Sequence, residues 1–346
     1  MALEERNHRV PWIDYAKGIC LVAVVGLYAT NYVQGLAQAE GWVQYWVDFA
    51  KPFRMPDFFL ISGLFLSRTI DHPWRTYLDR KIVHFMYFFA LWTTLYFAVA
   101  LFAGEFSGEQ VLWTEYLWWY IEPFHMLWFI AMLPVYFLVA RLFRRVPWII
   151  MLPLLALLQI WSPETGLRQL DRFGERYIYF YAGYIFAPLA FQLAAWVSAR
   201  PGRAAGGLLI WAILNEALVL AGMADKPVFS LVLGFAGAGA VISLASLLSD
   251  LRWLDWLRYL GENSIVVFLS FFLFTLASAR LLFRFGWIAD IGSQTMLVTA
   301  ISIVGPVMLY WTVRQTPLRY MFQRPRWASL ERGKSSKVKV QARPSR

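Results

Sequence analysis

The sequence is poor in charged residues and in cysteine, and each shortage excludes a class of protein. Only 16% of its 346 residues are charged, whereas a soluble domain carries about a quarter. The single cysteine, Cys20, lies inside an apolar run, so an intrachain disulfide framework and a cysteine-based metal site are both excluded. No internal repeat is visible, which argues against a transporter made of two inverted halves.

Apolar and aromatic residues dominate the chain instead. Hydrophobic residues make up 59% of it, and its 18 tryptophans and 17 tyrosines are typical of the aromatic belts at membrane interfaces. We therefore predict an all-α polytopic membrane protein with about ten transmembrane helices. The expected spans are residues 15–36, 53–69, 82–103, 124–142, 147–161, 177–197, 204–222, 228–248, 263–283 and 294–314.

These spans form one expected membrane domain, residues 1–328, followed by a basic tail. The tail, residues 329–346, is rich in Lys, Arg and Ser and has no apolar period, so it is expected to be disordered. Ten spans place both termini on one side, and the loops on that side carry 24 lysines and arginines against 8 on the other. The positive-inside rule then predicts cytoplasmic termini. The net charge of +10 is explained by attraction to anionic membrane lipids, and no nucleic-acid partner is expected.

Polar residues interrupt the first span, which begins just after a lysine. Lys17, Tyr28 and Asn31 fall within about 60° of one another on a helix, and Lys17 and Tyr28 are about 16 Å apart along its axis. This alignment suits a long, thin, anionic donor that is held at its head by the lysine and used at its tip. The alternative is an ordinary first transmembrane helix with a snorkelling lysine and helix-packing polar groups.

Two other spans carry acidic residues, which are costly inside a membrane and therefore candidates for function. Asp57 follows Arg54 by three residues near the start of the second span, so the two side chains could instead form a structural pair. Glu216 follows Asn215 near the middle of the seventh span, where its alternative role is pairing with an Arg or Tyr of a neighbouring helix.

A histidine and a pair of cations mark the ends of two more spans. His125 opens the fourth span at the predicted outer face, where a lone histidine is more often structural than catalytic. Arg80 and Lys81 precede the third span on the predicted cytoplasmic side. These two cations could bind phosphates, or they could serve only to set the topology.

Four segments together resemble the acyltransferase-three family of membrane acyltransferases, especially its fucose O-acetylase-like and glucan succinylase-like branches. They are WIDYAKGI at 12–19, MPDFFLISGLF at 55–65, HMLWF at 125–129 and LGENSIVVFL at 260–269. The segments occur in the family's order, and ten spans with cytoplasmic termini match its architecture. In the family, a basic residue of the first helix is followed eleven positions later by histidine. Here Lys17 holds the basic position but Tyr28 replaces the histidine, and Phe271 replaces a second common histidine.

The resemblance implies a multi-pass protein of the bacterial inner membrane that moves an acetyl or succinyl group from cytoplasmic acyl-CoA. The acceptor would be a hydroxyl of a carbohydrate, a glycolipid or a lipid-linked glycan, and no metal is expected. In this interpretation the donor's phosphates are bound by point charges, two residues of the first helix line the reaction point, and one of three others removes the acceptor's proton. The donor-binding residues are then Lys17, Arg80 and Lys81, the lining residues Tyr28 and Asn31, and the candidate bases His125, Asp57 and Glu216.

Two other functions remain open, because a tyrosine with a pKa of about 10 is a poor general base near neutral pH. One is a non-catalytic relative that acts in glycan export or as a membrane partner. The other is a secondary transporter that uses Glu216 and the Arg54–Asp57 pair as coupling groups. A titratable side chain packed beside Tyr28 would favour the enzyme.

Overall fold

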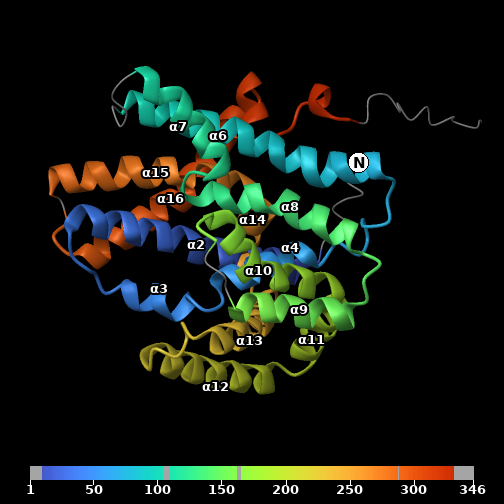
Figure 1. The fold of residues 1–346 in the computed structure, drawn as a ribbon. Helices are drawn as coiled ribbons and strands as arrows, with labels where there is room; N and C mark the ends of the chain where they lie inside the picture. Colours follow the sequence, from blue (N-terminus) through green and yellow to red (C-terminus); the bar gives the residue numbers. More distant parts are fainter. Residues whose placement is uncertain (1–9, 104–108, 162–164, 287, 331–346) are drawn as a thin grey trace, which may run out of the picture.

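In a computed structural model, residues 10–103, 109–161, 165–286 and 288–330 are described, and they consist of helices and short connections (Figure 1). The elements are α2 (Pro11–Ala37), α3 (Gln44–Ala50), α4 (Arg54–Gly63), α5 (Trp74–Leu78), the π-helix η1 (Asp79–Val83), α6 (His84–Phe102), α7 (Glu109–Ile121), η2 (His125–Leu127), α8 (Trp128–Leu142), α9 (Trp148–Trp161), α10 (Arg168–Ile185), α11 (Ala187–Ala199), α12 (Pro201–Leu220), α13 (Pro227–Leu248), η3 (Arg252–Leu254), α14 (Asp255–Glu262), α15 (Ser264–Phe285), α16 (Ile291–Val313), η4 (Pro317–Met321) and η5 (Arg326–Ala328).

Seven helical segments in the described ranges are long and apolar enough to cross a membrane, and they match seven of the ten expected spans. They are Pro11–Ala37, Trp74–Phe102, His125–Leu142, Pro201–Leu220, Pro227–Leu248, Ser264–Phe285 and Ile291–Val313. The prediction of an all-α polytopic membrane protein is thereby confirmed. The count of ten crossings and the side on which the termini lie stay predictions.

The other three expected spans differ from straight crossing helices. The span expected at 177–197 is the pair α10 and α11, bent by 72°, because Pro188 in the first turn of α11 disfavours a continuous helix. The span expected at 147–161 is α9, with 14 residues. The span expected at 53–69 is α4, which has only ten residues and is followed by turns after Gly63.

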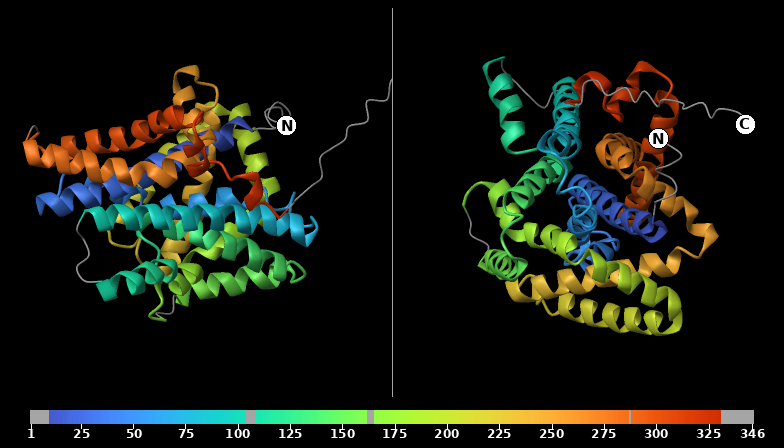
Figure 2. Two further views of the ribbon diagram at one scale, coloured as in Figure 1. Left: turned by 90° about the horizontal axis from the view of Figure 1, so that it is seen from above. Right: turned by 90° about the vertical axis from the view of Figure 1, so that its right-hand side faces the viewer.

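Helix α2 lies in the middle of the fold and is the element on which the others are arranged. It packs against α14, α15, α16, α13 and α4, and in the end-on view it is surrounded by the other helices (Figure 2, right). Its buried residues include both apolar side chains, such as Leu21 and Val25, and small ones, such as Ala16. The first span predicted from sequence is therefore the central helix of the domain.

Two glycines allow α4 and α10 to cross at backbone contact. A Cβ atom on Gly63 would lie 2.1 Å from the carbonyl oxygen of Phe180, and one on Gly183 would lie 2.1 Å from that of Leu60. No side chain fits at either position without a backbone shift, so both helices need glycine there. Helix α10 carries Arg168, Arg172 and Arg176 along one face. The crossing fixes the position of this face relative to the start of α4.

The last described segment is anchored at one buried carboxylate. Asp79, in η1, accepts hydrogen bonds from Arg324 Nη2 at 2.7 Å, Ser329 Oγ at 3.1 Å and the backbone N–H of Leu330 at 2.5 Å. Three donors on one carboxylate hold the segment that precedes the predicted tail against the start of α6. Residues 331–346, most of that tail, lie outside the described residues.

Candidate functional site

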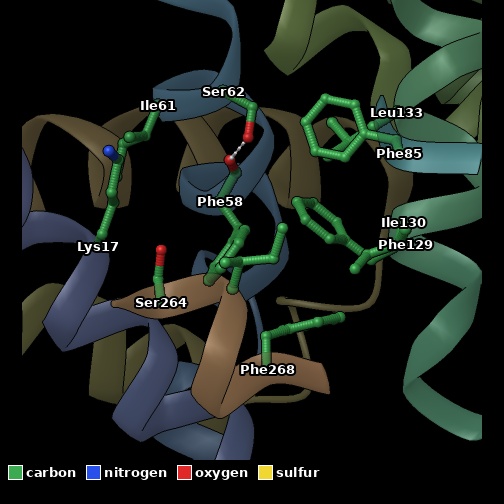
Figure 3. A pocket seen from close by; sticks show the side chains of 11 residues that line it. Lys17, Phe58, Ile61, Ser62, Phe85, Phe129, Ile130, Leu133, Ser264 and Phe268 are labelled. Atoms are coloured by element: carbon green, nitrogen blue, oxygen red, sulfur yellow. Dashed lines mark hydrogen bonds between the residues drawn. The ribbon is translucent and has the colours of Figure 1, made fainter. Parts of the chain in front are cut away.

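A cavity beside Lys17 is lined by residues of α2, α4, α6, α8 and α15. We call it the inner cavity, and its volume is about 130 Å³. Figure 3 shows Lys17 and Ser264 on one side of it, Phe85 and Phe129 on the other, and Phe58 between them. Apart from Lys17, Ser62 and Ser264, all its lining residues are apolar. Such a space suits a slender, largely apolar chain whose charged end stays at the lysine.

Lys17 is the cation at this cavity, and it is only partly neutralised. Its Nζ lies 3.6 Å from Asp14 Oδ1, and its side chain is 34% exposed. Water screens the lysine end of this ion pair, whereas the Asp14 side chain is only 9% exposed. Lys17 therefore keeps the capacity to bind an anion, and its role in donor binding stays a prediction.

The other two predicted donor-binding cations, Lys81 and Arg80, do not line the inner cavity. Lys81 places its Nζ 4.6 Å from the centre of the Phe137 ring, and Phe137 stacks on Phe85, which lines the cavity. Arg80 is exposed. The structure thus joins Lys17 and Lys81 to one region, whereas the side chain of Arg80 points to the surface.

A series of aromatic ring contacts connects the wall of the inner cavity with Tyr28. Phe268 and Phe129 line the cavity, and the Phe268 ring centre lies 6.3 Å from that of Phe271. Phe271 in turn contacts Tyr28, with ring centres 5.7 Å apart. Phe268 and Phe271 thus link the cavity wall to the Tyr28 ring.

Tyr28 and Phe271 occupy the two positions where the resembled family has histidines, and they contact each other. Tyr28 also packs edge-on against Phe272 at 6.2 Å. Its hydroxyl accepts a hydrogen bond from Trp128 Nε1 at 3.4 Å. Because the indole N–H donates to the oxygen, the hydroxyl proton of Tyr28 is left to donate to a bound group.

Two arginines on α10 lie over the ring of Trp128, and sequence reasoning missed them as site residues. The guanidinium carbons of Arg172 and Arg176 are 4.8 and 4.9 Å from the ring centres of the buried Trp128 indole, within cation–π range. These arginines and Arg54 also act electrostatically on Tyr28. Arg172 and Arg176 thus lie over the indole whose N–H donates to the Tyr28 hydroxyl, so their positive charges are near the position where a negative charge would develop.

A signal for these arginines was present in the sequence. Arg168, Arg172 and Arg176 are spaced by four residues, so they share one helical face in a chain with few charges. From the sequence alone, these arginines are among the eight basic residues on the side opposite the termini. The spacing alone could not show that the face meets Trp128 of another helix.

His125 lies near Tyr28 but on the exposed side of the same aromatic cluster. Its ring centre is 4.7 Å from that of Phe272, which contacts Tyr28. It lines a small cavity of about 90 Å³ together with Phe124 and Arg280. Its backbone φ of +37° is uncommon for a residue other than glycine, and such strain is often found at functional sites. Of the candidate bases, His125 is thus connected to Tyr28 through one ring.

The remaining predicted site residues are placed differently. Asn31 is exposed. Asp57 is buried, and neither of its carboxylate oxygens has a hydrogen-bond partner, so the proposed Arg54–Asp57 pair does not form a hydrogen bond. Asp57 acts electrostatically on Cys20 and Tyr179. Asp57 lies on α4, which packs against α2 and α10, and it has no contact with Tyr28 among the described interactions.

Glu216 and Asn215 belong to a peripheral layer. Asn215 Nδ2 donates to the backbone carbonyl of Phe49 at 2.9 Å, and α12 packs on α13, α11 and α3. One oxygen of Glu216 is buried without a hydrogen-bond partner. These residues belong to a different layer from Tyr28 on α2, and the described residues contain no cluster of three metal-ligating side chains.

Comparison with known proteins gives a single family. A sequence profile of the acyltransferase-three family, described as an acyltransferase domain, matches residues 10–313. The inner membrane protein YcfT of Escherichia coli (strain K12) is 30% identical over 174 residues, which cover 44% of this chain and 47% of YcfT. The chain thus spans about half the length of this curated relative. No solved structure matches it.

Proposed function

Because this chain belongs to the acyltransferase-three family of membrane proteins, we propose that it moves an acyl group from cytoplasmic acyl-CoA to a hydroxyl of a glycan or glycolipid. The observation that carries the proposal is the inner cavity, which lies beside Lys17 and is linked to Tyr28 through Phe268 and Phe271. Acetyl-CoA and succinyl-CoA are the expected donors. The proposed location is the bacterial inner membrane, since the relative YcfT is an inner membrane protein.

In this proposal the donor enters from the Lys17 side. Lys17 binds a phosphate of CoA as a point charge, and Lys81 adds positive potential through its position over Phe137. The slender pantetheine arm follows the apolar walls of the inner cavity. A shift of the Phe268 and Phe271 rings then admits the thioester to the Tyr28 hydroxyl, because Phe268 lines the cavity and contacts Phe271, which contacts Tyr28.

The chemical step transfers the acyl group from the sulfur of CoA to the hydroxyl oxygen of the acceptor. The acceptor hydroxyl oxygen attacks the thioester carbon, its proton passes to His125, and the carbon–sulfur bond breaks so that CoA leaves as a thiolate that is then protonated. Tyr28 donates a hydrogen bond to the carbonyl oxygen while that oxygen becomes negative. The field of Arg172, Arg176 and Arg54 stabilises the same charge.

A second function is favoured by one observation. Tyr28 and Phe271 fill both histidine positions and pack on each other, which also fits a relative that has kept the scaffold without the reaction. In that case the protein would act as a membrane partner or in glycan export.

The experiment that separates the two functions uses purified protein and whole cells. The enzyme should bind acetyl-CoA or succinyl-CoA, and mass spectrometry should find an acylated glycan or lipid that is absent from cells without the protein. Binding without any change in the acylation profile would contradict transfer. If the protein neither binds acyl-CoA nor changes the acylation profile, the non-catalytic relative would be favoured.

A further inference from the structure

A second cavity lies at the opposite end of α4 from the Lys17 side. We call it the outer cavity, and its volume is about 370 Å³. The start of α4 lines it together with α9, α10 and the start of α13. Unlike the inner cavity, it is lined by charged and polar side chains, among them Lys51, Arg54, Gln159, Glu175, Arg176 and Tyr179.

The arginines of the outer cavity have N–H groups without partners. Arg54 is 7% exposed; its Nη1 donates to the carbonyl oxygen of Val47 at 3.2 Å, and its Nε has no hydrogen-bond partner. Arg176 is paired through Nη2 with Glu175 at 3.2 Å, but its buried Nη1 has no partner. A buried donor of this kind is costly unless a ligand satisfies it.

The carboxylates of the cavity do not cancel its positive charge. Lys51 is paired with Asp225 at 2.6 Å, and Arg176 is paired with Glu175. Arg54 is bonded to a backbone carbonyl, so its charge remains without a carboxylate partner among these residues. The cavity therefore keeps one excess positive charge at its most buried arginine.

We propose that the outer cavity binds an oxyanion, a carboxylate or a phosphate, carried by the acceptor saccharide. Guanidinium N–H groups match the geometry of both oxyanions, and the volume is of the size of a small-ligand pocket. Arg176 also lies 4.9 Å from a ring centre of Trp128, whose indole N–H donates to the Tyr28 hydroxyl, so we assign an anion held here to the acceptor. The assignment to the acceptor rests on the proposed acyl transfer, whereas the binding of an oxyanion does not.

The first test uses the full-length wild-type protein in lipid nanodiscs without acyl-CoA. Saturation-transfer NMR compares glucuronate, glucose 6-phosphate and neutral glucose, with inorganic phosphate as competitor. Both anionic sugars, or one of them, should bind about tenfold more tightly than glucose, as expected for one charge-assisted hydrogen bond, and phosphate should displace them. The stronger of the two identifies the oxyanion. Equal affinity for all three sugars would overturn the proposal.

The second test uses variants of α10 and α4. Arg176→Gln and Arg54→Gln should each remove the preference for anionic sugars. Arg168→Gln is the matched control, because Arg168 lies two turns before Arg176 on the same helix, is 72% exposed and pairs with Glu122 outside the cavity. If Arg54→Gln fails to fold, Arg176→Gln decides alone. A preference that survives Arg176→Gln, or one that Arg168→Gln also removes, would contradict the site.

Acyl-CoA binding measured on the same samples separates this inference from the proposed function. Binding of anionic sugars without acyl-CoA binding would keep the outer site and reject the transferase. Acyl transfer to neutral acceptors with no anion preference would keep the transferase and reject the outer site.

Discussion

The inner and outer cavities share one wall, the ten-residue helix α4, and differ in chemistry. Phe58, Ile61 and Ser62 of α4 face the inner cavity, whereas Arg54 and Met55 face the outer one. The difference follows from the order of residues, since α4 begins with Arg54, whereas Phe58 and Ile61 in its second half are apolar. A single short helix thus separates a space suited to an apolar chain from a space suited to a polar, anionic group.

Tyr28 lies where these two environments meet. It is linked to the wall of the inner cavity through Phe268 and Phe271 and is within the field of the arginines of the outer cavity. In acyl transfer, a thioester that enters along an apolar cavity has to meet a polar acceptor that binds in a charged cavity. The comparison therefore predicts different effects for variants at Tyr28, at the inner cation and in the shared wall.

The largest expected effect concerns the side of the membrane that each cavity faces. It is measured as reporter activity, which should be either present or absent. A reporter that is active only outside the cytoplasm should work when fused after residue 110 and fail after residue 74 or 340. This result follows from the distribution of 24 and 8 basic residues between the two sides. A working fusion after residue 74 would reverse the orientation, and the inner cavity could then not receive a cytoplasmic donor.

The next largest effect is expected for the Tyr28 hydroxyl. Tyr28→Phe keeps the ring contacts with Phe271 and Phe272 and removes only the oxygen that Trp128 binds. If the hydroxyl stabilises the carbonyl oxygen, the rate of acyl transfer should fall about 10²-fold or more with little change in expression. A rate within a few-fold of wild type would make Tyr28 a packing residue.

Tyr32→Phe is the matched control for this change. Tyr32 lies one turn further along α2 and also packs on Phe272, but its hydroxyl accepts from Arg280 instead. Its loss should leave the rate within a few-fold of wild type. Tyr28→His restores the residue typical of the family and should retain or raise transfer, since imidazole titrates near neutral pH. No transfer by either wild type or Tyr28→His would favour the non-catalytic relative.

The sequence was sufficient for part of this site. The length and polar pattern of the first span predicted α2 and the alignment of Lys17 with Tyr28, because both depend only on helical periodicity. The contact between Tyr28 and Phe271 joins α2 to α15, and no spacing within one helix predicts which residues meet across two. The resemblance to the family marked both positions, but it did not show that they touch.

The remaining differences have local causes that sequence periodicity does not register. A hydropathy pattern treated 53–69 as one span, whereas Gly63 and Gly183 bring α4 against α10 and the chain then turns away. The bend between α10 and α11 was visible in principle from Pro188. Glu216 was a candidate because it is an acid within an apolar span, and only the tertiary packing places it in the layer of α12.

The third prediction concerns the donor side. Lys17→Ala should weaken acyl-CoA binding about 10-fold or more, the value of one well-made contact to a charged phosphate. Lys81→Ala should have a smaller effect, since Lys81 lies over Phe137 behind the cavity wall, and Arg80→Ala the smallest, since Arg80 is exposed. Binding of anionic sugars should not change in any of the three. If folded Lys17→Ala binds acyl-CoA as tightly as wild type, Lys17 serves only to set the topology.

The smallest effect on each activity is expected in the wall that the cavities share. Gly183→Ala places a Cβ atom 2.1 Å from the carbonyl oxygen of Leu60, so α4 must move away from α10. We expect a loss of about 1–3 kcal/mol in stability, the usual cost of overpacking, seen as a lower midpoint of thermal unfolding. Gly206→Ala is the control, because nothing lies within 4 Å of its Cβ position on α12, and alanine favours a helix. In the folded fraction of Gly183→Ala, acyl-CoA and anionic-sugar binding should both weaken a few-fold, since one helix lines both cavities. Weakening of only one of them would show that the cavities do not depend on a common wall.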